Sequence, residues 1–80
     1  MTPDACSLAD LELRTAARIV KVCASGAMRV QLLEMGFVRG TRVEVLKRAP
    51  LGDPLELRVR GYHVCLRAED AAAVRVERCQ

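Results

Sequence analysis

Two segments in the second half of the chain alternate between apolar and polar side chains. In residues 41–47 the valines share one face, and in residues 55–60 leucine and valine alternate with charged residues. Alternation with a period of two is typical of strands that have one buried face. The two segments therefore predict neighbouring strands of a small antiparallel sheet.

The six residues between these strands, 49–54 (Ala-Pro-Leu-Gly-Asp-Pro), contain too much proline and glycine to continue a sheet. Pro50 suits the second position of a type I turn, and Gly52 suits the fourth. Pro54 restricts Asp53 to extended backbone, which makes Asp53 a turn residue. The hexapeptide therefore predicts a defined connecting loop.

A two-residue loop at Arg60 and Gly61 would fix the pairing of the strands on either side of it. The apolar pairs across this hairpin are then Val59 with Tyr62, Leu57 with Val64 and Leu55 with Leu66. All six side chains share the core face, because the side-chain period of a strand is two. On the outer face the pairs are Arg58 with His63 and Glu56 with Cys65.

Hydrophobic runs and breaker residues predict the remaining elements. They are an N-terminal turn with Leu8 and Leu11 in the core, a first strand at 16–23, a helix at 27–35 with Ser25 as N-cap and Gly36 as C-terminal stop, a helical turn at 68–72, and a last strand at 73–77. No linker or composition shift divides the chain, so residues 1–80 are expected to form a single domain. The predicted fold is mostly β: a small, partly open barrel of about five antiparallel strands with one intervening α-helix.

The predicted helix is apolar on two sides. Met28, Leu32 and Met35 follow helical spacing and form one core stripe. Val30 and Leu33 lie roughly on the opposite side. Two explanations stay open: either the N-terminal segment covers Val30 and Leu33, or they are offered to a partner protein.

Composition narrows the classes of function. Basic residues give a net charge of +3, but they are interleaved with acidic ones, and the chain has only Phe37 and Tyr62 as aromatics. Nucleic-acid binding would need clustered basic and stacking side chains, so none is expected. No segment approaches the length needed to cross a bilayer, and no signal peptide is visible. We therefore expect a cytoplasmic protein with four reduced, widely spaced cysteines and no direct membrane insertion.

Candidate chemistry is sparse. A single histidine, with no phosphate-binding loop and no nucleophile–base set, predicts a protein that is not an enzyme. His63 and Cys65 share the outer face of their strand, and Glu56 lies opposite Cys65, so the three could bind zinc or ferrous iron weakly. Arg58, opposite His63, would repel a cation. Such a metal is more readily shared between molecules than held within one, and no cofactor is expected to be required.

The segments LLEMGFVRGTRVEVL and APLGDPLELRVRGYHVCLR closely resemble the FeoA family of bacterial ferrous-iron uptake. The resemblance runs from Leu8 to Val76 and includes the unaltered hexapeptide APLGDP. Two departures are visible: the family usually has proline at the position of Arg39, and a glycine-containing turn at residues 12–14. The resemblance implies an SH3-like barrel and an accessory role in ferrous-iron uptake.

The resemblance also implies a partner, the FeoB-type permease, whose cytoplasmic portion carries a GTP-binding domain. The candidate contact residues are Val30, Leu33, Leu51, Gly52 and Asp53. Two other functions stay open: an SH3-like regulatory domain such as those of iron-dependent repressors, which the missing helix-turn-helix pattern opposes, and a weak metal-binding iron carrier. A weak homo-oligomer is a further alternative.

Overall fold

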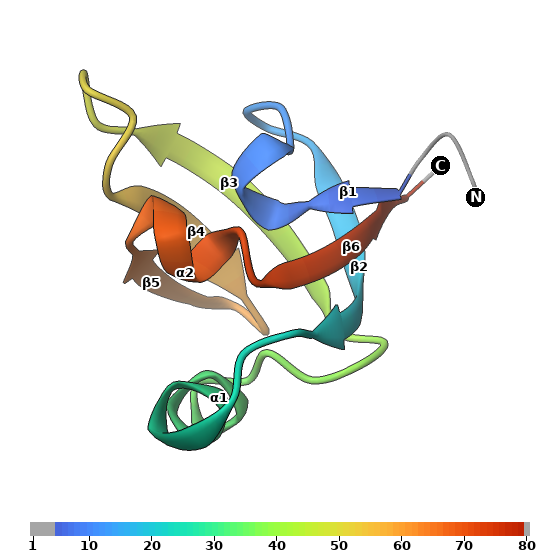
Figure 1. Cartoon of the computed structure of the whole chain (residues 1–80). Helices are drawn as coiled ribbons and strands as arrows, with labels where there is room; N and C mark the ends of the chain where they lie inside the picture. Colours follow the sequence, from blue (N-terminus) through green and yellow to red (C-terminus); the bar gives the residue numbers. More distant parts are fainter. Residues whose placement is uncertain (1–4, 80) are drawn as a thin grey trace.

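The computed structural model describes residues 5–79 (Figure 1). Its elements are β1 (Ala5–Ser7), the 3-10 helix η1 (Leu8–Asp10), β2 (Ala16–Val22), α1 (Gly26–Glu34), β3 (Arg42–Arg48), β4 (Leu55–Val59), β5 (Tyr62–Leu66), α2 (Ala68–Ala71) and β6 (Val74–Arg78). The mostly β composition and the single long helix are as the sequence predicts. Each predicted element lies within one or two residues of its observed bounds.

All six strands belong to one antiparallel sheet with the order β1-β6-β2-β3-β4-β5. Figure 1 shows this sheet strongly curved, with η1 and α2 between its two edge strands and α1 apart at one end. The sixth strand, β1, is the one that the sequence does not reveal. It has only three residues and pairs solely with β6, so its alternation is too short to read.

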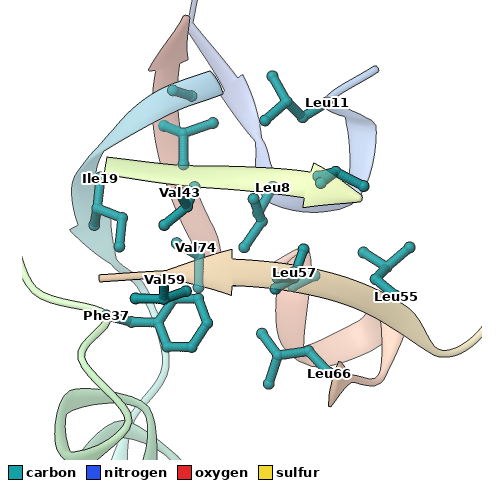
Figure 2. Packing of buried hydrophobic residues seen from close by; sticks show 14 of the residues in the cluster. Leu8, Leu11, Ile19, Phe37, Val43, Leu55, Leu57, Val59, Leu66 and Val74 are labelled. Carbon is teal, nitrogen blue, oxygen red and sulfur yellow. The ribbon is translucent and has the colours of Figure 1, made fainter. Parts of the chain in front are cut away.

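The inward faces of the strands form one apolar core (Figure 2). Phe37 is fully buried and lies beside Val59 in this view. Leu8 and Leu11 are also fully buried, which confirms their predicted place in the core. An SH3-sized barrel therefore encloses its core with side chains from strands, from η1 and from the segment after α1.

The β4–β5 hairpin has the predicted register at every pair from Val59–Tyr62 to Leu55–Leu66. Arg60 and Gly61 have φ angles of +54° and +85°, as a two-residue turn with left-handed central residues requires. The prediction that Tyr62 points into the core is wrong, because its side chain is 75% exposed. Phe37 lies against Val59 on β4 (Figure 2). Tyr62 is the first residue of the edge strand β5 and is not among the buried core residues.

The 49–54 loop has the predicted turn. The Gly52 N–H donates to the Ala49 carbonyl at 2.7 Å, so Pro50 and Gly52 occupy the second and fourth positions. Helix α1 ends at Glu34, and Gly36, the expected C-terminal stop, follows the C-cap Met35 with a φ of +102°. Ser25 is the N-cap residue of α1, but its side chain makes no capping hydrogen bond.

The two sides of α1 have different surroundings. Leu32 is fully buried, and Met28 and Met35 pack partly against the core, as the stripe predicts. Val30 and Leu33 are exposed. The expectation that the N-terminal segment covers them is wrong, because η1 packs against α2 and β6 instead of α1. The second apolar side of the helix is therefore accessible.

Candidate functional site

Exposed apolar side chains gather where α1 meets the end of β2. The exposed fractions are 36% for Val20, 56% for Val30 and 36% for Leu33. The other large exposed apolar side chains of residues 5–79, those of Leu13, Leu51 and Tyr62, lie on other elements. Single exposed apolar residues are ordinary on protein surfaces, whereas a cluster can indicate a contact site. The α1–β2 surface is therefore the first candidate site.

An open groove of about 440 Å³ runs through this surface. Val20, Val22, Leu33 and Phe37 are its apolar lining residues, and Lys21, Arg29 and Arg39 are its basic ones. We call these seven residues the α1–β2 groove. The volume falls within the range of small binding sites.

A register shift in β2 explains how Val20 reaches the groove. Ile19 pairs with Val76 and Lys21 with Arg75, so Val20 is an extra residue in the strand. A β-bulge of this kind disrupts the alternation of side chains. Val20 and Lys21 are consecutive, yet both are exposed. The sequence gives no signal for this bulge, so strand alternation could not identify the groove.

The polar part of the groove is entirely basic. Arg29 is anchored, because its Nη1 donates to the Val22 carbonyl at 2.9 Å and ties α1 to the end of β2. Among the described residues, no carboxylate lies within ion-pair distance of Lys21, Arg29 or Arg39. The groove therefore combines an apolar floor with uncompensated positive charge.

The candidate residues of the 49–54 loop lie elsewhere. Leu51 is almost fully exposed, and Gly52 has a φ of +85°. The Asp53 carboxylate accepts a hydrogen bond of 2.8 Å from the backbone N–H of Ala68, at the start of α2. Figure 1 places this loop at the end of the barrel away from α1, and none of its residues lines the groove. The structure therefore separates the predicted contact residues into two surfaces.

The outer face of the β4–β5 hairpin holds the candidate metal ligands. His63 and Cys65 are exposed on β5, and His63 Nδ1 lies 4.0 Å from Glu56 Oε1. Arg58, opposite His63, directs its Nη1 toward Glu44 Oε1 at 3.9 Å. Within residues 5–79, no three His, Cys, Asp or Glu side chains are grouped closely enough to hold a metal ion. One molecule thus brings Glu56 and His63 near each other without completing a ligand set.

The described part of the chain carries no disulfide. Cys6 and Cys79 are partly buried, and Cys23 and Cys65 are exposed, all four as free thiols. None of the described helices is long and apolar enough to span a membrane.

The fold and the surface together define the class of protein: a small SH3-like barrel with an apolar groove. The model of the FeoA domain matches residues 6–78. The chain belongs to the FeoA family, as the resemblance in its sequence implies.

Known proteins support this assignment. Over 70 residues, 88% of this chain, it is 46% identical to the Fe(2+) transport protein A/Fe(2+) transporter FeoB fusion protein of Porphyromonas gingivalis, and it spans only 8% of that protein. The crystal structure of Stenotrophomonas maltophilia FeoA complexed with zinc, described as a procaryotic SH3 domain protein, is 33% identical, with a TM-score of 0.79 over 89% of this chain and 88% of that one. A manganese-dependent transcriptional repressor is 20% identical, with a TM-score of 0.86 over 99% of this chain and 44% of that one. The repressor shows a shared fold alone.

Proposed function

We propose that this protein is a non-enzymatic, cytoplasmic accessory protein of ferrous-iron uptake that binds the cytoplasmic portion of a FeoB-type permease. The observation that carries the proposal is the fusion relative, in which a segment 46% identical to this chain is joined to a FeoB transporter. A fusion holds its two parts close together at a high effective concentration. We infer that the two parts act on each other, and we therefore expect the corresponding separate chains to associate.

The surface of the molecule supports a binding role. The α1–β2 groove, together with Val30 one turn before Leu33, offers an apolar area that the fold itself leaves uncovered. Interfaces with a partner need such an apolar centre surrounded by polar groups. The 49–54 loop, with its exposed Leu51, is a second contact candidate at the other end of the barrel.

The proposal is tested by calorimetric titration of the protein with the purified cytoplasmic portion of the permease from the same organism. We expect saturable binding. Both the GTP-bound and the nucleotide-free forms of that portion should bind, but their affinities need not be equal. Absence of binding in both forms would refute the proposal.

Two matched variants identify the surface. Val30→Ser removes an exposed apolar side chain from α1, and Leu51→Ser removes one from the 49–54 loop. Because both side chains are exposed, neither change should unfold the barrel. Weaker binding by Val30→Ser alone would place the permease on α1, and weaker binding by Leu51→Ser alone would place it on the loop. Unchanged binding by both would refute the two surfaces as contacts.

A further inference from the structure

The basic residues of the α1–β2 groove indicate what kind of partner segment binds there. We propose that the groove binds a short polypeptide segment in which one or two apolar side chains are flanked by carboxylates. This inference rests on the proposed function, because it supplies the chemistry of the partner segment at that surface.

The charge arrangement is the first support. Lys21 lies directly opposite Arg75 on the neighbouring strand, and both are exposed. Like charges directly opposite each other in a sheet are destabilising. Arg18 and Arg42 also lie opposite each other, but there Glu77 lies opposite Arg18 on its other side. Lys47, exposed on β3, lies opposite Glu56. Positive charge left without a local carboxylate among residues 5–79 favours an anionic ligand.

Arg39 brings a further positive charge to the groove. It lies in the segment after α1 and lines the groove together with Arg29 and Lys21. Three basic side chains from three different parts of the chain therefore meet at one hollow, which favours a partner segment with matching acidic residues.

The shape of the groove favours a polypeptide over other anions. Phe37, the aromatic residue of the groove lining, is fully buried, so it cannot stack on a nucleic-acid base. A membrane surface is contacted by apolar side chains that protrude, whereas Val20 and Leu33 line a hollow and are each only 36% exposed. A hollow of about 440 Å³ instead suits inserted apolar side chains from a peptide.

Two blocked synthetic peptides test the inference. Both carry the same pair of leucines, flanked by glutamates in one and by lysines in the other. Fluorescence anisotropy with the full chain should give an affinity for the glutamate peptide about tenfold or more above that for the lysine peptide. The preference should shrink as salt is raised, because exposed charges are screened. Equal affinity for the two peptides, or no binding of either, would overturn the inference.

Charge-reversed variants locate the binding. Lys21→Glu and Arg39→Glu should each weaken binding of the glutamate peptide several-fold, and Lys47→Glu, the same change on an exposed strand position outside the groove, should not. Leu33→Ala should weaken the binding of both peptides. Equal losses for Lys21→Glu and Lys47→Glu would show that only net charge matters, and would overturn the inference. Binding to phosphatidylglycerol vesicles that is lost in Leu33→Ala would also overturn it, in favour of a membrane surface.

The same variants separate this inference from the proposed function. If the permease portion binds Lys21→Glu and Arg39→Glu as tightly as the unaltered protein, the inference fails and the proposed function stands. If the glutamate peptide binds in the groove but the permease portion does not bind, the proposed function fails and the chemistry of the groove stands.

Discussion

Arg78 donates two hydrogen bonds to the carboxylate of Glu12, from Nε to Oε2 at 3.0 Å and from Nη2 to Oε1 at 2.7 Å. This ion pair joins the turn before β2 to the end of β6. The hydrogen bonds from Arg78 hold the pKa of Glu12 below its ordinary value. The pair therefore makes stability depend on pH.

The sign of this dependence follows from the lowered pKa of Glu12. A carboxyl group whose pKa is lower in the folded protein than in the unfolded chain stabilises the fold above its unfolded pKa, and the stabilisation is lost as pH falls through the folded pKa. We expect Glu12→Gln to lower the free energy of unfolding at neutral pH, and the difference from the unaltered protein to shrink below about pH 4.5. Urea unfolding at several pH values measures both. A difference that does not change with pH would show that the charge of Glu12 does not contribute.

Arg14 is held in a left-handed conformation. Its φ is +64°, and its backbone N–H donates to the Val45 carbonyl at 2.6 Å. This conformation costs a residue with a Cβ atom about 1 kcal/mol. We expect Arg14→Gly to raise the free energy of unfolding by up to about 1 kcal/mol, less the added entropy of glycine in the unfolded chain.

Arg14→Ala is the matched control for this prediction. It removes the same side chain beyond Cβ but keeps the conformational cost, so thermal melts should show no comparable gain. Equal stabilisation by alanine and glycine would mean that the arginine side chain, and not the left-handed backbone, is responsible.

Asp53 ties the 49–54 loop to α2. Because its carboxylate accepts the hydrogen bond from Ala68 N–H, Asp53→Ala leaves that donor without its partner. We expect a loss of about 1 kcal/mol, the usual cost of removing such a side chain at a helix start. Asp53→Asn keeps an oxygen acceptor and should retain most of the stability. Chemical denaturation of both variants compares them, and equal losses would argue against a contribution from this hydrogen bond.

Leu32 and Leu33 are adjacent leucines with opposite surroundings. Leu32 is fully buried and Leu33 is partly exposed in the groove. Leu32→Ala should cost about 2–5 kcal/mol through the cavity that it leaves. Leu33→Ala should cost at most about 1 kcal/mol. Thermal unfolding measures both, and similar costs would contradict the exposed placement of Leu33.

The outer face of the hairpin leads to a prediction about metal. Zinc or ferrous iron should bind weakly, through His63 and Cys65, and more readily between two molecules than within one. Titration in reducing buffer against a competing chelator measures the affinity, and His63→Ala or Cys65→Ser should remove the binding. Tight one-to-one binding that survives both changes would show that other residues are the ligands.

The barrel could be predicted because its signals are local. Alternation along β3 and β4 fixes which faces are buried, and the two-residue turn at Arg60 and Gly61 fixes the register of the hairpin. A one-residue slip would turn every apolar side chain outward, so hydrophobicity alone selects the pairing. The resemblance carried by the APLGDP hexapeptide likewise identified the family that the FeoA domain match shows.

The surface could not be predicted, because it depends on what covers each face in three dimensions. Helical spacing shows that α1 is apolar on two sides, but only the packing of η1 on α2 and β6 leaves Leu33 exposed. Tyr62 also depends on the tertiary structure: it lies on the predicted face of its strand, but its side chain lies beyond the core and is exposed. The neighbouring residues in the sequence do not indicate this exposure.

The α1–β2 groove shows most clearly the difference between what the sequence predicts and what the tertiary structure decides. Its lining comes from β2, from α1 and from the segment after α1, and an unpredicted bulge in β2 turns Val20 and Lys21 outward together. By itself the sequence determined five of the six strands and the register of the β4–β5 hairpin, because alternation and turn residues act over a few neighbouring positions. Only the tertiary structure decided which apolar and basic side chains meet at the surface, because that depends on contacts between elements distant along the chain.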